Sequence, residues 1–272
     1  MGQALLYPFL LLRRRPVTIL LCLLAGWVVS VAVDVMLPDL SRVRYVNNLP
    51  PLAYALRSSF YESIKTVVQA YPGAIIGVCA LIDLGARDPA ATPRFADGLR
   101  WAAMGVVYLL LIVTPLSAAM QAISVWYEPA RESGSWMRSW ISRGEWLALD
   151  IAFLLRLGLA WPDALAKQRY VLFKSWTLAR GRHWVVVGAL LPISVGLTVT
   201  HSFALHSFYQ LTEGFRIDLG AMLYEDSSRW RLYDAAFVDA MIILQAYIFN
   251  AATAFVYARV LPLTPRAAAE VF

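Results

Sequence analysis

RRRPVTILLCLLAGWVVSVAVDVM, residues Arg13 to Met36, is the stretch that decides the fold. Three arginines precede a long apolar run, and a transmembrane helix needs about 20 mostly apolar residues to cross a hydrocarbon core of about 30 Å. A secretory signal peptide is the competing interpretation, with RRR as its basic region and SVAVD as its cleavage site. The apolar run is longer than the core of such a signal. The stretch therefore predicts a transmembrane helix over residues 16–36.

The composition of the whole chain agrees with a lipid environment. Of 272 residues, 60% are hydrophobic and 15% are charged, whereas soluble domains have about 45–50% apolar and about 25% charged residues. The ten tryptophans fit a protein with bilayer interfaces, where Trp and Tyr gather. Cys22 and Cys79 lie inside apolar runs, which predicts two buried hydrophobic side chains and no disulfide framework.

Five further stretches are candidates for membrane spans. The second, 60–84, is weaker because Glu62, Lys65, Gln69 and Asp83 interrupt it. The fourth, 146–161, is short and contains Asp150 and Arg156. A proline inside the third predicts a kink, and no stretch has the alternation of a membrane β-strand. We predict an all-α integral membrane bundle of about six transmembrane helices without a soluble domain. It forms one domain, 1–272, with an interfacial segment 1–15 and spans at 16–36, 60–84, 101–126, 146–161, 184–205 and 235–261.

The distribution of basic residues predicts the orientation. With the N-terminus in the cytoplasm, thirteen Lys and Arg residues lie inside and ten outside, which favours both termini in the cytoplasm under the positive-inside rule. The three arginines at 13–15 contribute most to this choice. Alanine-rich composition and the use of arginine over lysine suggest a bacterial source, so the predicted location is a bacterial plasma (inner) membrane.

A cationic and aromatic collar precedes the fifth span. Within residues 174–184, lysine and arginine side chains can extend toward lipid phosphates while tryptophans lie at head-group level. The net charge of +6 therefore indicates anionic lipid as the partner, and no basic stretch carries a motif for reading nucleic acid. The predicted lipid head-group contacts are Lys174, Trp176, Arg180, Arg182 and Trp184.

The same region resembles a known family. WPDALAKQRYVLFKSWTLARGRHWVVVGALLP, Trp161 to Pro192, is similar to a block found in the glycerophosphoryl diester phosphodiesterase membrane-domain family and its YciC-like bacterial relatives. The matching residues are Ser175, Trp176, Thr177, Arg180, Gly181 and Trp184. The resemblance implies a helical membrane module of about six spans. It does not imply phosphodiesterase activity, because in that family the hydrolase is a separate soluble barrel.

No motif for catalysis or metal binding emerges. His183 lies at one end of the fifth span and His201 and His206 near the other, too far apart for one metal site at a rise of about 1.5 Å per residue. The sequence has no HExxH, CxxC or GxSxG motif and no Gly-rich phosphate loop after a strand. We therefore predict no catalytic residues, no metal and no cofactor, and a protein that is not an enzyme.

Ionisable residues inside spans are the best candidates for a site, since such groups are expensive in lipid. Arg156 needs a partner if its stretch crosses the membrane, and Asp150, Asp239 and Glu62 are the candidates. Lys65 follows Glu62 by three residues and shares its helix face. The predicted intramembrane polar network is Arg156, Asp150, Asp239, Glu62 and Lys65. Alternatively, the stretch around Arg156 is amphipathic and the arginine faces water.

These observations favour a non-enzymatic membrane protein, either an accessory or scaffold subunit or a factor in envelope lipid homeostasis. The expected partners are anionic membrane lipids, together with a membrane protein or further copies of this chain, but no nucleic acid. The loop from Ser207 to Arg231 is the largest external polar segment and the expected docking surface. The alternative is a small transporter or channel whose polar path uses Arg156 and the span carboxylates. An enzyme acting on a membrane lipid ranks third.

Overall fold

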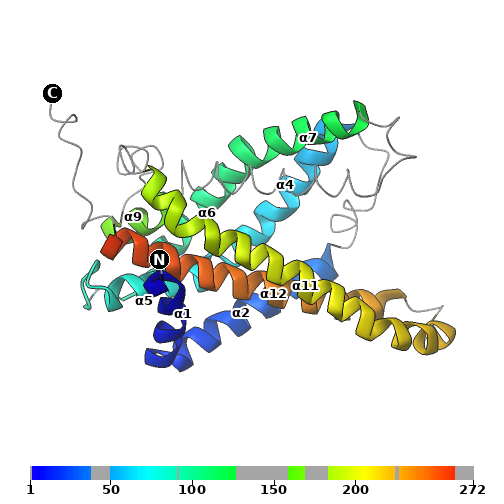
Figure 1. Cartoon of the computed structure of the whole chain (residues 1–272), viewed down its shortest axis with the longest axis horizontal. Coiled ribbons are helices and arrows are strands. Elements are labelled where there is room, and N and C mark those ends of the chain that lie inside the picture. The colour runs from blue at the N-terminus through cyan, green and yellow to red at the C-terminus, as the bar shows by residue number, and fades with distance from the viewer. Residues whose placement is uncertain are drawn as a thin grey trace.

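The computed structural model describes residues 2–37, 50–90, 92–126, 159–168, 183–223 and 227–260. Within these ranges the chain forms helices joined by turns and contains no strand, which confirms the expected all-α class. The helices, labelled in Figure 1, are α1 Gly2–Arg14, α2 Pro16–Met36, α4 Pro51–Val68, α5 Ala70–Asp83, α6 Phe95–Tyr108, α7 Thr114–Trp126, α9 Ala160–Lys167, α11 His183–Leu223 and α12 Ser227–Phe255. Two π-helical segments, Leu109–Val113 and Val256–Val260, follow α6 and α12.

Four of the described helical stretches are long and apolar enough to cross a membrane. They cover Pro16–Met36, Phe95–Ala119, His183–Leu205 and Ala236–Arg259, and they overlap four of the six expected spans. The expected span 60–84 is a bent pair of helices, so the number of candidate spans is four or five. Most of the expected span 146–161 lies outside the described residues.

The bend in the second expected span follows from a proline. The two arms, Ala55–Val68 and Ala70–Asp83, meet at an angle of 58°. Pro72 has no backbone N–H to bond to the carbonyl of Val68 and its ring clashes with that carbonyl, so a straight helix cannot continue there. The chain turns at Gln69, whose carbonyl accepts a bond from Gly73 N at 3.0 Å. A broken span of this kind leaves polar backbone near its centre.

The third expected span accommodates its proline differently. The π-helical segment Leu109–Val113 lies just before Pro115, and Thr114 N–H bonds to Leu109 O, five residues back. The Thr114 hydroxyl also approaches Leu109 O at 2.9 Å and donates to the Ser59 hydroxyl at 2.6 Å. The kink expected at Pro115 is thus a local change of helix type that joins α6 to α7, and its threonine contacts α4.

Helix α12 lies at the centre of the described helices. It contacts α1, α2, α5 and α11, while α4 packs against α6 and α7 and α5 packs against α6 and α9. Figure 1 shows α11 and α12 as two long antiparallel helices crossing the others. Small buried residues let the helix backbones approach closely, as is common in membrane proteins. On α12 these residues are Ala251, Ala252, Thr253 and Ala254.

Two glycines on α5 receive bulky side chains from its neighbours. A Cβ at Gly73 would lie 2.7 Å from the indole of Trp101 on α6, and a Cβ at Gly77 would lie 2.6 Å from Leu165 of α9. Since Gly73 and Gly77 are four residues apart, they form one face of the helix. This glycine face fixes α6 and α9 against α5, which places the charged residues at the end of α5 beside those of its neighbours.

The outer faces of the described spans are apolar. Only 22% of the residues in the α2 window are buried, although the window is strongly hydrophobic. Helix α1 likewise exposes large apolar side chains while Tyr7 and Leu11 pack inward. In water such surfaces would be unfavourable, so they fit contact with lipid tails. On α2 the exposed side chains include Val17, Leu20, Leu21, Leu24 and Val28.

The expectation of a loop from Ser207 to Arg231 is wrong for most of its length. Helix α11 continues without interruption to Leu223, and α12 begins at Ser227. The 41 residues of α11 correspond to about 62 Å at about 1.5 Å per residue. The apolar membrane window ends at Leu205, so the polar remainder was mistaken for a loop because the hydropathy falls while the helix continues.

Candidate functional site

A charged cluster joins three helices inside the described bundle. Lys65 Nζ of α4 lies 2.7 Å from Asp34 Oδ1 of α2 and 2.8 Å from Asp239 Oδ1 of α12. The three side chains are 10%, 14% and 1% exposed, respectively. The Tyr61 hydroxyl donates to Asp34 Oδ1 from the same helix as Lys65. We call Asp34, Tyr61, Lys65 and Asp239 the lysine cluster.

The positions along the helices explain why these side chains meet. Asp34 comes two residues before the end of α2, and Asp239 comes three residues after the start of the last membrane window. Trp27 Nε1 donates to Ala236 O at 2.7 Å and fixes α2 against α12 near this level. Asp34 and Asp239 therefore lie near the same end of their spans, with Lys65 between them.

The lysine cluster has an excess of negative charge. One ammonium group contacts two carboxylates, so the three formal charges sum to minus one. Asp239 Oδ2 is buried and has no hydrogen-bond partner among the described residues. Burying an ionised group without full pairing is costly in a low dielectric, so the cluster has capacity for a further positive charge.

A second cluster lies at the other end of the described bundle. Arg87 Nη2 contacts Asp97 Oδ2 at 2.9 Å and Arg100 Nη1 contacts Asp97 Oδ1 at 2.9 Å. The Arg94 backbone N–H also donates to Asp97 Oδ2 at 2.9 Å, closing the start of α6. Asp97 is fully buried and the Arg87 side chain is 1% exposed. We call Arg87, Arg94, Asp97 and Arg100 the arginine cluster.

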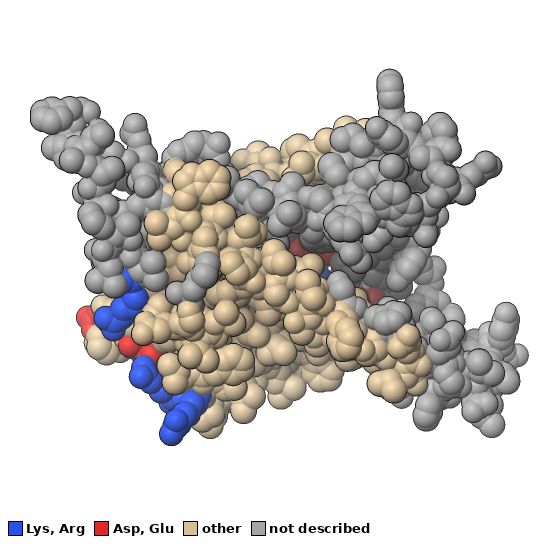
Figure 2. Space-filling view, in the orientation of Figure 1, with Lys and Arg blue, Asp and Glu red and all other residues tan. Residues whose placement is uncertain are grey.

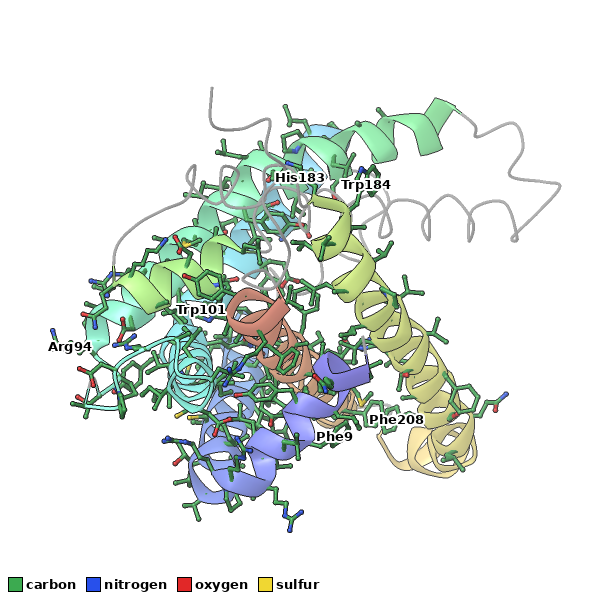
Figure 3. All side chains as sticks on the ribbon, turned by 60° about the vertical axis from the view of Figure 1, so that its left-hand side comes forward. Phe9, Arg94, Trp101, His183, Trp184 and Phe208 are labelled. Atoms are coloured by element: carbon green, nitrogen blue, oxygen red, sulfur yellow. The ribbon has the colours of Figure 1, made fainter. Side chains whose placement is uncertain are left out.

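Helix α9 is attached beside the arginine cluster. Arg87 Nη1 donates to Leu165 O at 2.9 Å. Asp163 accepts from the Tyr257 hydroxyl at 2.8 Å and pairs with Lys167 at 2.5 Å. The indoles of Trp101 and Trp161 meet edge to face with ring centroids 3.9 Å apart. Figure 3 shows Trp101 toward the interior and Arg94 at the periphery, so this end combines buried pairing with an exposed basic rim.

A more exposed ion pair at the same end of the bundle links α1 to α5. Arg14 Nη1 bonds to both carboxylate oxygens of Asp83, at 2.9 and 2.8 Å, and this hydrogen bonding raises the pKa of Arg14 further above its usual value. The Tyr7 hydroxyl donates to Ala80 O and to Asp83 Oδ2. Burial, reinforced by the nearby negative charge of Asp83, raises the pKa of Tyr7. Figure 2 shows basic and acidic atoms gathered at one end of this face, over the region of α1 and α5.

The structure brings together part of the polar network expected from the sequence. Lys65 and Asp239 are in direct contact, and Glu62 lies three residues before Lys65 on α4. Arg156 and Asp150 lie outside the described residues. Asp34 is a member that the expected network did not include. Its occurrence as the one charged residue of an otherwise apolar α2 was the available signal.

Of the predicted lipid head-group contacts, only Trp184 lies among the described residues. Trp184 is 79% exposed at the start of α11, and Figure 3 shows it beside His183 at that end of the helix. An exposed indole at the beginning of an apolar window suits the head-group level of a bilayer. The other predicted contacts, Lys174, Trp176, Arg180 and Arg182, lie outside the described residues.

Comparison with known proteins adds no assignment. Searches against protein families, curated proteins and solved structures found no match to this chain. Among the described residues no group of three or more His, Cys, Asp and Glu side chains is arranged to hold a metal ion. The lysine cluster and the arginine cluster are therefore the candidate sites that geometry supports.

Proposed function

We propose that this chain is a non-enzymatic scaffold or accessory subunit of a bacterial plasma membrane, with both termini in the cytoplasm. The observation that carries the proposal is the hairpin of α11 and α12, which extends past the other described helices (Figure 1). Such a projection offers a partner polypeptide a surface outside the bilayer. The apolar sides of the remaining helices anchor the protein in the membrane.

The dimensions of the hairpin support this proposal. After the apolar window ends at Leu205, α11 runs 18 residues further to Leu223, which is about 27 Å of helix. Helix α12 begins at Ser227, nine residues before its own window at Ala236. Phe208 and Phe237 stack with ring centroids 4.1 Å apart and hold the two helices together near the membrane boundary. The hairpin is thus an extended helical element beyond the bilayer.

Lipid contact is the second part of the proposed mechanism. Under the positive-inside orientation, we expect Trp184 at the cytoplasmic head-group level, and the basic residues that precede it in the sequence, within 174–182, suit anionic lipid. We propose that the collar sets the depth of α11 and thereby the height of the hairpin.

Charge reversal in the hairpin tests the proposal. The full-length protein would be extracted gently from its own membrane and its assemblies weighed by native mass spectrometry. We expect a second membrane polypeptide in fixed ratio, lost in the double variant Glu213→Lys with Asp218→Lys. The matched control is Asp88→Lys, an exposed acidic residue at the opposite end. A lone chain in the wild-type preparation, or a partner retained by the double variant, contradicts the proposal.

The lysine cluster favours a small transporter as a second candidate function. A charged cluster among membrane helices is a common feature of ion and substrate paths. In vesicles containing the purified chain, a transporter of this design would carry protons or a coupled solute, reported by a pH-sensitive dye inside. Lys65→Met should abolish the flux, whereas Arg14→Gln at the far end should preserve it. Equal flux in empty vesicles and wild-type vesicles would exclude this candidate.

A further inference from the structure

We infer that the lysine cluster is a proton-binding site, in which Asp34 and Asp239 share one exchangeable proton beside the ammonium group of Lys65. The inference does not depend on the hairpin or its partner. It rests on three observations: the pairing of two carboxylates with one ammonium, the burial of the group, and the unpartnered oxygen of Asp239.

The charge balance of the lysine cluster favours binding of one proton. Lys65 Nζ is within 2.8 Å of one oxygen from each aspartate, so it can neutralise one carboxylate while the other stays in excess. Two carboxylates that share a poorly solvated site do not both ionise readily. A single proton on either aspartate makes the three groups neutral.

The burial of Asp239 also favours binding of a proton. Asp239 is 1% exposed, and its Oδ2 has no hydrogen-bond partner among the described residues. Its Oδ1 is already bonded to Lys65 Nζ at 2.8 Å. An anionic oxygen buried in this way lacks the solvation that water would provide. Oδ2 is therefore a buried oxygen at which the shared proton would supply a missing interaction.

The same geometry selects a proton over a metal ion. The ammonium group occupies the position between the two carboxylates where a cation would otherwise bind. A second full cation would approach that ammonium and be repelled by it. A proton adds its charge on an oxygen and needs no coordination sphere.

The location of the cluster shows how protons reach it. Asp34 is 14% exposed and lies two residues before the end of α2, which is about 3 Å along the helix. Water at the membrane face opposite the N-terminus can exchange a proton with Asp34. Lys65 Nζ contacts Oδ1 of both aspartates, so it can donate one of its own protons to Asp239 while it accepts the proton of Asp34. One N–H and one O–H bond break as one O–H and one N–H bond form, so the ammonium group is restored and no oxidation state changes.

Other titratable groups near the cluster must be separated from it. Tyr61 and Glu62 belong to α4, and Tyr61 bonds to Asp34. His201 lies on α11, which packs against α12. Cys22 of α2 and Tyr247 of α12 are eight or more residues from the aspartates of their helices. Across α5, Asp83 lies at the far end beside Arg14, so Glu62 is the carboxyl that a test must distinguish.

Infrared spectroscopy of the full-length protein in lipid vesicles tests the inference. At neutral pH the wild type should show the C=O band of a protonated carboxylic acid, which disappears when the pH is raised. Incorporation of ¹³C-labelled aspartate should shift this band, since it arises from aspartate and not from glutamate. The wild-type measurement needs no substitution, so misfolding of a variant cannot obscure it.

Substitutions then assign the band to the cluster. Asp34→Asn and Asp239→Asn should each abolish it, because either change leaves one ammonium paired with one carboxylate. Glu62→Gln and Asp83→Asn should leave the band intact. Circular dichroism and gel filtration would verify that each variant is folded. The inference is overturned if the wild type lacks the band, if both asparagine variants retain it, or if only Glu62→Gln removes it.

Discussion

The arginine cluster and the lysine cluster differ in how many positive groups contact their buried carboxylates. Asp97 accepts bonds from two guanidinium groups and from the backbone of Arg94, so its charge is fully compensated. Asp239 shares a single ammonium with Asp34 and keeps one oxygen without a described partner. Both aspartates are almost completely buried. Burial alone therefore does not make a carboxylate structural. The number of positive groups that contact it decides its role.

The difference also follows from the chain positions. Asp97 is in the first turn of α6, where free backbone N–H groups and the positive end of the helix favour an anion. Asp239 and Lys65 lie inside their helices, whose backbone groups are already bonded to each other. Asp97 finds its charged partners within ten residues along the chain, whereas the lysine cluster depends on side chains from three helices.

The largest expected effect is at Asp97. Asp97→Asn leaves Arg87 and Arg100 without their shared counter-ion while the Arg87 side chain stays buried. Removal of one partner from a buried pair destabilises proteins by about 3–5 kcal/mol. We expect a loss of that size in unfolding by sodium dodecyl sulfate from mixed micelles. Asp88→Asn, an exposed neighbour, is the control, and equal stability of the two variants would contradict the compensated role of Asp97.

The next largest effect is expected at Lys65 and depends on pH. Lys65→Met leaves two carboxylates together without the ammonium, which should reduce stability by about 3 kcal/mol at neutral pH. The folded variant then binds protons more readily than the unfolded chain. Its stability should consequently rise as the pH falls and drop as the pH increases. Unfolding curves collected from acidic to neutral pH measure this slope, and a pH-independent loss would show that packing is responsible.

A smaller effect is expected at Asp239. Asp239→Asn retains an oxygen that accepts a bond from Lys65, and it leaves one ammonium with one carboxylate, Asp34. The net change should be about 1 kcal/mol or less, the usual contribution of one hydrogen bond. The same Asp→Asn substitution is thus expected to cost much more stability at Asp97 than at Asp239. A loss at Asp239 as large as that at Asp97 would remove the distinction between the clusters.

The smallest effect is expected at Arg14, whose side chain is 56% exposed. Arg14→Gln breaks its bonds to Asp83, but an ion pair in contact with water contributes little and weakens with salt. The unfolding midpoint should shift only slightly at low salt and remain unchanged at high salt. Measurements at two salt concentrations check this, and a large, salt-independent shift would place Arg14 with the buried pairs.

Apolar runs predicted the straight helices well, and local chemistry explains where they did not. Residues 16–36 form one helix as expected, since Pro16 starts it and no proline interrupts it. In the second stretch, hydropathy detects apolar character on both sides of Gln69 but not the turn imposed by Pro72. The length of α11 was missed because polarity after Leu205 marks the membrane boundary and not the end of a helix.

The candidate site was predictable in its residue types but not in its partners. Lys65 and Asp239 attracted attention because charged residues are rare in apolar spans. Their contact joins positions 174 residues apart, and helical periodicity carries no information at that distance. The burial of Arg87 against Asp97 was not expected from the sequence. The spacing of Asp97 and Arg100 at the start of an apolar run was the local signal for that cluster.

The length of α11 has a mechanical consequence. It is a single helix of 41 residues, about twice the thickness of a hydrocarbon core at about 1.5 Å per residue. In the proposed arrangement, the apolar part of α11 up to Leu205 lies in the bilayer against α12 and the remainder stands outside. A small tilt of the embedded part would then move the outer tip by a larger distance.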